Sequence, residues 1–448
     1  MRFHIATLGC KINQYESQSL REAWIARGWQ EVDAPAQAQM VLVHTCAVTA
    51  GAVADSRGAV RRAGREAPEA QLLVAGCAAQ VEPESFAQLH GVCAVVPQRD
   101  KAALRRWPGP SDVSDVSDAS GANTQAGDRA VWPDFSITRF HRARPILKVQ
   151  DGCSHCCTYC IVPRARGGPR SRPLDAIVAE ARRLLEAGHR ELILSGINLG
   201  QFRLDKPGGD FWDMLVRLEA ALAPQWAGRA RLRLSSLDPG MLTARGADVL
   251  AGSSMVCPHL HVSLQSADPG VLAAMGRAHY GPDDVLGFLE RLRGRWGLFA
   301  LGADILTGFP GEGPAAFEAT RAFMERVEMS YAHVFPYSRR PGTLAARVKD
   351  QLDAAEKKRR ARALRDAAQA LEEGFLARLA ALPELEMAVE RDSPGAGASQ
   401  YYVECVLDGP APAPVGALAR VRPVGTRGQA LEVAPAFTNA AQTGYDEG

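Results

Sequence analysis

The sequence predicts an α/β protein with three folded parts: an N-terminal doubly wound parallel sheet, a central partial (β/α) barrel and a small C-terminal β-barrel. Two observations predict the α/β class. Apolar runs of strand length alternate with helical patterns over the first part of the chain, and the alternation resumes from Arg144. A third observation, short strands separated by Gly and Pro turns after Pro383, predicts the terminal β-barrel.

The N-terminal part, residues 1–108, has the pattern of a strand–helix repeat. Leu20, Ala23, Trp24 and Arg27 recur at helical spacing, and Gly28 ends that helix. Strands connected through helices pair in parallel, and a doubly wound sheet presents its ligand groups at the carboxyl ends of the strands. The strands are expected at 3–9, 40–45, 71–76 and 92–97.

The rest of the chain divides by composition and periodicity. Residues 109–138, rich in Ser, Asp, Gly and Ala, predict a flexible linker, and 439–448 predict a loose tail. The barrel occupies 139–370, with its chemistry expected at the strand C-terminal ends, and the β-barrel occupies 371–438. Barrel strands are expected at 145–150, 190–196, 230–236, 259–265, 300–308 and 330–338, with helices at 174–188 and 315–328 and a long basic helix at 353–382.

Composition narrows the class of protein and its surroundings. The chain has 448 residues, of which 46% are hydrophobic and 23% charged, so it has material for several cores, and its net charge of +2 means that a polyanion must be met by local basic patches. The N-terminus lacks the features of a signal peptide and no apolar run is long enough to span a membrane, so we expect a cytoplasmic protein. In that reducing compartment its ten cysteines favour metal or redox chemistry over disulfides.

Four cysteines crowd the stretch "DGCSHCCTYCIVPRARG" at 151–167: Cys153, Cys156, Cys157 and Cys160. The spacing allows C-x3-C-x2-C through Cys157 or C-x2-C-x3-C through Cys156. Structural zinc sites take four ligands from two separated pairs, whereas three thiolates suit a 4Fe-4S cluster with one iron open to a substrate.

A second set comprises Cys10, Cys46 and Cys77, each of which follows an expected strand. Because the carboxyl ends of parallel strands meet at one edge of a sheet, these sequence-distant thiols should be neighbours.

The stretch "GCSHCCTYC" resembles the cluster loop of radical S-adenosylmethionine enzymes, and "CIVPRARG" resembles their methylthiotransferase branch. The resemblance implies that Cys153, Cys157 and Cys160 hold a 4Fe-4S cluster in a radical S-adenosylmethionine barrel and that Cys156 is spare. In that family the open iron binds S-adenosylmethionine, whose reductive cleavage gives a radical that abstracts hydrogen from an unactivated carbon.

The segments "TLGCKINQYES", "HTCAVTAGAVADSRGAVRR" and "VAGCAAQ" resemble the cysteine segments of the methylthiotransferase N-terminal domain. The resemblance implies a second 4Fe-4S cluster on Cys10, Cys46 and Cys77, which carries the transferred sulfur. One departure is His44, which stands where the family usually has Asn; a structural role is favoured over a ligand role.

Family position also implies the contacts to S-adenosylmethionine. Tyr159 is expected near the adenine; Ser195, Gly196 and Asn198 near the methionine end; and Ser263 and Gln265 beside the ribose. Ser and Gln at strand ends are equally often turn or cap residues.

Further matching segments extend the resemblance from about residue 3 to about residue 380. Within the branch, "LGCKINQYES" and "HVFPYSRRPGT" are similar to the subgroup that transfers a methylthio group to carbon 2 of N6-threonylcarbamoyladenosine at position 37 of tRNA. The resemblance implies a tRNA substrate, a reductant such as flavodoxin or ferredoxin, and a monomer. A protein-modifying relative and an iron–sulfur electron carrier with an RNA module are the alternatives.

RNA contacts must come from local basic runs, since the net charge is small. The candidates are 139–144, 164–172 and 356–365, although the third could equally be a solvated helix face. The terminal β-barrel resembles a TRAM domain, an RNA-binding module, and Arg420, Arg422 and Arg427 are its candidate contacts.

Overall fold

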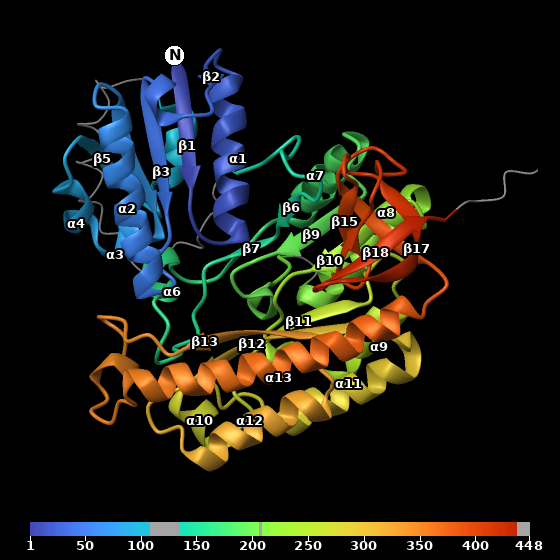
Figure 1. Ribbon diagram of the computed structural model, residues 1–448. Helices are drawn as coiled ribbons and strands as arrows, with labels where there is room; N and C mark the ends of the chain where they lie inside the picture. The colour runs from blue at the N-terminus through green and yellow to red at the C-terminus, as the bar shows by residue number, and fades with distance from the viewer. Residues whose placement is uncertain (108–131, 133–134, 206–207, 437–448) are drawn as a thin grey trace, which may run out of the picture.

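The computed structural model describes residues 1–107, 132, 135–205 and 208–436. Most of the predicted linker and the whole predicted tail lie outside the described residues. Figure 1 shows the N-terminal sheet beside the barrel, with the C-terminal strands packed against the barrel's far side. Among the helices described, none combines the length and apolar character required to cross a bilayer.

The N-terminal part is one parallel sheet of strand order β2-β1-β3-β4-β5. β2 was not expected from the sequence. The chain moves outward from β1 to β2 and then returns to β3 on the other side of β1, so the winding direction reverses between β1 and β3, which is where doubly wound sheets bind ligands. The strands are β1 (Arg2–Thr7), β2 (Gln30–Glu31), β3 (Met40–Thr45), β4 (Gln71–Gly76) and β5 (Val92–Pro97).

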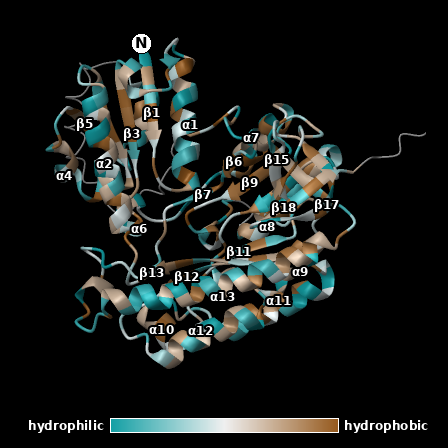
Figure 2. Cartoon of the chain, viewed as in Figure 1, coloured by the Kyte–Doolittle hydropathy of each residue, from teal (hydrophilic) through white to brown (hydrophobic). Residues whose placement is uncertain are grey.

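Helices cover both faces of this sheet, as its apolar strands require. Met40 and Leu42 of β3 face a core that includes α1, whereas Val41 and Val43 face a core that includes α2 and α3. Figure 2 shows apolar residues concentrated in the strands and alternating with polar ones along the outer helices. The helices are α1 (Lys11–Ile25), α2 (Ala50–Glu66), α3 (Cys77–Val81) and α4 (Pro83–Ala87).

The central part is a partial barrel of six parallel strands, at the positions predicted. They form two three-stranded sheets, β10-β9-β6 and β11-β12-β13. The Leu237 backbone joins the sheets: its N–H donates to the His261 carbonyl (2.8 Å) and its carbonyl accepts from the Ser263 N–H (2.9 Å). The strands are β6 (Ile146–Lys148), β9 (Glu191–Ser195), β10 (Arg231–Leu234), β11 (His259–Gln265), β12 (Ala300–Thr307) and β13 (Tyr331–Pro336).

Amphipathic helices surround the barrel strands. Their buried apolar residues, such as Leu184 of α7 and Leu289 of α11, join the main core. In Figure 1, α13 lies alongside β12 and β13, with α10, α11 and α12 beneath it. The helices are α7 (Leu174–Glu186), α8 (Phe211–Trp226), α9 (Ala244–Gly252), α10 (Pro269–Ala274), α11 (Pro282–Trp296), α12 (Pro314–Arg326) and α13 (Ala354–Ala380).

The C-terminal strands form a ring of order β14-β15-β16-β18-β17, in which β17 also pairs with β14. β15 was not expected. Helix α13 runs through residue 370, the boundary expected between barrel and ring, and its last turns bury Phe375, Leu376 and Leu379 in the core of the ring. The strands are β14 (Leu385–Arg391), β15 (Ala396–Ser399), β16 (Glu404–Val406), β17 (Leu418–Arg427) and β18 (Ala430–Pro435).

The end of the predicted linker is packed rather than loose. Phe135 and Ile137 are buried, the Tyr15 hydroxyl donates to the Phe135 carbonyl (3.0 Å), and the Ile137 N–H donates to Glu180 (2.9 Å). Two apolar side chains after a polar stretch are enough to fix residues 135–138 between the N-terminal sheet and the barrel.

A buried carboxylate holds the ring to the barrel. Glu191 at the start of β9 accepts from Arg231 (2.7 Å) and Arg233 (2.6 Å). The same arginines donate to the ring carbonyls of Ala398 and Ser399 (2.9 Å each). Burial alone would raise the pKa of Glu191, but Arg233 and Arg231 hold this pKa well below its usual value.

Glu191→Gln is therefore expected to lower the free energy of unfolding by about 3–5 kcal/mol at pH 7, because it leaves buried arginines without their counter-charge. The contribution of a carboxylate with a depressed pKa is present above its unfolded pKa and is lost on acidification. In urea titrations, the difference in free energy of unfolding between the parent and the variant should therefore narrow as the pH falls below 4.5. The matched control is Glu386→Gln, whose side chain is 38% exposed, and it should lose less than about 1 kcal/mol.

Candidate active site

The loop with four cysteines leaves the barrel after β6 and is fixed at its base. Short strands β7 (Gln150–Asp151) and β8 (Arg170–Ser171) pair at its two ends, and helix α6 (Val162–Arg166) lies between them. The Cys153 N–H donates to the Gly167 carbonyl (3.0 Å). Gly152 has φ +71°, and a Cβ there would lie 2.0 Å from the Gly168 carbonyl oxygen, so the loop closes only on glycine.

Three of the four cysteines line one cavity of about 270 Å³: Cys153, Cys157 and Cys160. The exposed Cys156 thiol lies outside it and is 3.8 Å from the Ser154 carbonyl. The cavity therefore brings together the C-x3-C-x2-C set. Burial, together with the neighbouring Cys157 and Cys153, raises the pKa of Cys160 to about 11, so a metal has to displace the proton.

The residues expected to contact S-adenosylmethionine separate into two groups. Tyr159, Asn198 and Ser263 line the cavity, and the Asn198 amide nitrogen is 3.7 Å from the Cys153 sulfur. Ser195, Gly196 and Gln265 do not line it. A Cβ on Gly196 would lie 2.8 Å from the Gln150 Cβ, so this glycine allows the strand end to pack closely.

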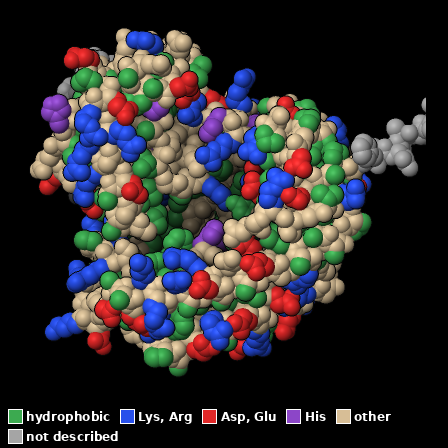
Figure 3. All heavy atoms as spheres, in the orientation of Figure 1, with side chains coloured by type: hydrophobic (Ala, Val, Ile, Leu, Met, Phe, Trp, Pro, Cys, Tyr) green, Lys and Arg blue, Asp and Glu red, His purple; other side chains and the backbone are tan. Residues whose placement is uncertain are grey.

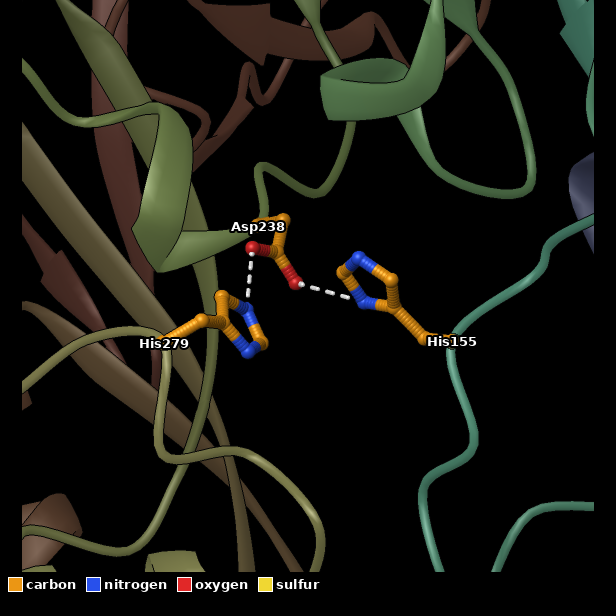
Figure 4. A group of neighbouring side chains, drawn as sticks. All are labelled: His155, Asp238 and His279. Carbon is orange, nitrogen blue, oxygen red and sulfur yellow. Dashed lines mark hydrogen bonds and ion pairs between the residues drawn. The ribbon is translucent and has the colours of Figure 1, made fainter.

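A carboxylate of the barrel lies beside the cysteine loop (Figure 4). Asp238, after β10, lies 2.9 Å from His279 and 3.8 Å from His155 of the loop. The group has the composition of a metal site, but the Arg277 guanidinium donates to the same Asp238 carboxylate (3.0 Å) and lies 3.6 Å from the Cys157 sulfur. A buried cation at that position disfavours a metal ion and provides positive charge beside the thiols.

The cavity fits a polar ligand bound next to the thiols. The Ser236 hydroxyl lines it and has no hydrogen-bond partner among the described residues. Ser236, Asp238, Arg277 and Asp304 were not named as site residues from the sequence. They lie within the part of the chain that resembles the family, but only side-chain geometry shows which residues face the cavity.

The second cysteine set meets at the carboxyl edge of the N-terminal sheet. Cys10 precedes α1, Cys46 follows β3 and Cys77 begins α3. Two glycines allow the approach, because a Cβ on Gly9 would lie 2.7 Å from the Cys46 sulfur and one on Gly76 would lie 2.6 Å from the Thr45 carbonyl oxygen. Burial, with Cys10 and Cys77 nearby, raises the pKa of Cys46.

Between the two sets lies a fully buried network of charges. Glu16 of α1 accepts from Lys101, from Lys148 (2.7 Å) and from Arg166 (3.2 Å), and Asp151 accepts from Lys148 (2.8 Å) and Arg166 (3.0 Å). Burial would raise the pKa of Asp151, but Lys148 and Arg166 lower this pKa to about 2. The network connects the sheet that carries one cysteine set to the loop that carries the other.

His44 belongs to this network. Its side chain is fully buried, with one ring nitrogen 2.8 Å from the Ser17 hydroxyl and the other 2.8 Å from the Lys101 ammonium. Both ring nitrogens of His44 therefore have a polar partner within the network, as expected for a structural rather than a ligand role.

Comparisons with known proteins agree with this architecture. Residues 2–97 match the "Uncharacterized protein family UPF0004" and residues 147–324 match the "Radical SAM superfamily". A threonylcarbamoyladenosine tRNA methylthiotransferase, MtaB, of Rickettsia prowazekii is 32% identical over 82% of each chain, and that of Aquifex aeolicus is 32% identical over 84% of this chain and 90% of its own. The chain belongs to the radical SAM methylthiotransferase family.

Other relatives of this methylthiotransferase differ in substrate or only share the fold. A ribosomal protein uS12 methylthiotransferase, RimO, of Chloroflexus aurantiacus is 31% identical over 79% of both chains. The methyltransferase TsrM of Kitasatospora setae, solved with cobalamin and a [4Fe-4S] cluster, is similar in fold (TM-score 0.57) at 18% identity over 77% of this chain and 76% of its own. As a member of the radical SAM superfamily, the methylthiotransferase uses a 4Fe-4S cluster and S-adenosylmethionine as cofactors.

Many arginines of the expected RNA-binding runs are structural in the methylthiotransferase. They are buried and paired with carboxylates: Arg166 with Glu16, Arg172 with Glu180, and Arg360 with Glu312. In the ring, Arg420, Arg422 and Arg427 are all exposed, and Arg420 pairs with Glu384 and Arg427 with Asp408. A separate cavity of about 540 Å³ is lined by Arg99, Arg164 and Arg170 among others and by no carboxylate. Arg99 pairs with Asp100 (3.3 Å) and Arg170 with Asp151 (3.7 Å) outside this lining.

Proposed function

We propose that this methylthiotransferase transfers a methylthio group to carbon 2 of N6-threonylcarbamoyladenosine at position 37 of tRNA, using two 4Fe-4S clusters. The observation that carries the proposal is the pair of three-cysteine sets on either side of the buried Glu16–Arg166 network, in a chain whose relatives include enzymes named for that nucleoside. Two cysteine sets suit an enzyme that both generates a radical and inserts sulfur.

The first cluster is assigned to Cys153, Cys157 and Cys160. When bound, this cluster and S-adenosylmethionine supply the radical that removes hydrogen from carbon 2. Tyr159, Asn198 and Ser263 line the cavity and would contact S-adenosylmethionine there, and Arg277 donates toward the Cys157 sulfur. Ser195, Gly196 and Gln265 act by shaping the strand ends around it.

The second cluster is assigned to Cys10, Cys46 and Cys77, which places the sulfur source on the N-terminal side of the same interface. Arg166 favours negatively charged thiolates there. Burial alone would lower the pKa of Arg166. The pKa is instead raised by nearby acidic groups, of which Cys77 has the largest effect and Cys10 is another. The guanidinium therefore partly balances the charge that the thiolates acquire on losing their protons.

The substrate nucleoside is expected in the barrel interior. Alternate residues of a strand face the same side, so His261 faces inward with Ser263. The His261 and His333 imidazoles lie 3.2 Å and 3.4 Å from the same oxygen of Asp304, a cavity residue. This group offers donors and acceptors to the hydroxyl, carboxylate and N–H groups of a threonylcarbamoyl substituent. Figure 3 shows a hollow in the face of the molecule that is turned toward the viewer, with Lys, Arg and His side chains around it.

The tRNA backbone is expected to bind the cavity of Arg99, Arg164 and Arg170, since three guanidiniums line it and the carboxylates that pair with Arg99 and Arg170 lie outside the lining. The C-terminal ring, with exposed Arg422, is assigned as a TRAM-like RNA contact. The enzyme acts as a monomer in the cytoplasm with a flavodoxin or ferredoxin as reductant.

The test compares tRNA and ribosomal protein from a strain that lacks the gene. Mass spectrometry of tRNA nucleosides should show loss of the 2-methylthio group from threonylcarbamoyladenosine. The parent gene should restore it, and Cys157→Ala should not. Unchanged tRNA nucleosides together with a ribosomal protein uS12 lighter by one methylthio group would instead assign the protein-modifying activity of the RimO relatives.

A further inference from the structure

Arg340, in the loop after β13, is a buried guanidinium with unused donors. The residue is 3% exposed, and its Nε and one terminal nitrogen are buried without a hydrogen-bond partner among the described residues. Its other terminal nitrogen makes a long bond to the Thr49 carbonyl (3.4 Å). A buried cation with two unmet donors is costly, so a partner is expected.

The Arg340 guanidinium lies beside the turn that follows Cys46. Thr49 follows Cys46 by three residues and caps α2, so Arg340 reaches from the barrel to the turn that carries this thiol. Burial lowers the pKa of Arg340, whereas Glu82 and Cys46 raise it and Arg57 lowers it. Glu82 pairs with Arg57, so it is not a dedicated counter-charge for Arg340.

The loop around Arg340 is held in place. The Thr343 hydroxyl donates to the Arg340 carbonyl (2.7 Å), and Arg164 of the first cysteine loop donates to the Gly342 carbonyl (3.4 Å). Gly342 has φ +84°, and a Cβ there would lie 1.9 Å from an Arg164 nitrogen. These contacts fix the backbone on both sides of Arg340, and its buried guanidinium lies next to the turn that follows Cys46.

We infer that Arg340 is a barrel residue that binds the N-terminal iron–sulfur cluster, with its Nε and free terminal nitrogen donating hydrogen bonds to sulfur. The inference rests on the second cluster of the proposed function. Three thiolates and a 4Fe-4S core are together anionic, and hydrogen bonds to sulfur and local charge set the potential of such clusters. Arg340 thereby couples the cluster of one domain to the other domain.

The test isolates the N-terminal cluster in the full chain by changing Cys153, Cys157 and Cys160 to Ala. In this background Arg340→Gln should shift the midpoint potential in an EPR titration to more negative values, because a nearby positive charge is lost. It should also accelerate loss of iron to a chelator by about tenfold, the factor by which removal of an outer hydrogen-bond partner commonly weakens metal binding. Arg340→Lys, which keeps the charge, should lie between Gln and the parent.

The matched control is Arg339→Gln, since Arg339 donates to the Ala346 carbonyl of its own loop (2.8 Å) and should leave both readouts unchanged. Thermal unfolding of the full chain without iron separates a structural role. There Arg340→Gln should be as stable as the parent or more stable, because it removes an unpaired buried cation.

An unchanged potential and iron-loss rate in Arg340→Gln, with the cluster present, would overturn the inference and leave the second cluster standing. A weaker tRNA affinity with an unchanged potential would assign Arg340 to an RNA phosphate instead. If the triple-alanine protein binds no iron, the second cluster of the proposed function fails, and the inference fails with it.

Discussion

Changing Cys153, Cys157 and Cys160 together to Ala is expected to remove about half of the iron bound by the anaerobically reconstituted chain and to abolish cleavage of S-adenosylmethionine. These three thiols line one cavity with Ser236 and Arg277, whereas Cys10, Cys46 and Cys77 lie at the edge of a different sheet. Each set should therefore load independently. Iron and sulfide quantification together with liquid chromatography of the cleavage product gives the measurement.

Two variants complete this experiment. Cys156→Ala should retain the iron and the cleavage activity, because the Cys156 thiol is exposed and outside the cavity. Changing Cys10, Cys46 and Cys77 to Ala should remove the other half of the iron and spare cleavage of S-adenosylmethionine. Full iron content in this second triple variant would show that the N-terminal thiols hold no cluster.

Glu16→Gln is expected to lower the free energy of unfolding by about 3–5 kcal/mol, because removal of one buried charge leaves its partners uncompensated. Glu16 is the common acceptor of Lys101, Lys148 and Arg166, and the side chains involved are at most 1% exposed. Since these cations come from both sides of the interface, the N-terminal sheet should also detach more easily. Urea unfolding measures the first effect, and limited proteolysis near residue 135 measures the second.

The matched control is Glu31→Gln, whose ion pair with Arg21 has side chains 16% and 32% exposed and should contribute less than about 1 kcal/mol. The double variant Glu16→Gln with Lys101→Met removes one of the uncompensated cations and should recover part of the loss. Equal stability of Glu16→Gln and Glu31→Gln would contradict a central role for the network.

The sequence predicts the strands well where apolar runs are long, and it misses short ones. The four long strands of the N-terminal sheet and all six barrel strands lie where periodicity places them. β2 has two residues, Gln30 and Glu31, and β15 is "AGAS"; neither carries an apolar signal, because their pairing is imposed by neighbouring strands. The long helix expected at 353–382 is α13 (Ala354–Ala380).

The candidate site was predicted in part, for a physical reason. Cysteines are rare and their spacing is informative, so both sets could be named from the sequence. Arg166, Arg277 and Arg340 could not, since arginine is common in this chain and only burial distinguishes an arginine beside a thiol from one on the surface. The same limit explains why Arg144 and Arg172 were expected to contact RNA but instead form ion pairs with Glu191 and Glu180.

Helix α13 has a mechanical consequence. Its first turns are pinned to the barrel by Arg360, whose guanidinium donates to Glu312 (2.7 Å), and its last turns are part of the ring's own core. An uninterrupted helix has no hinge, so the ring cannot swing while the barrel stays still. The distance between a molecule bound to the ring and the reactive cavity is therefore fixed.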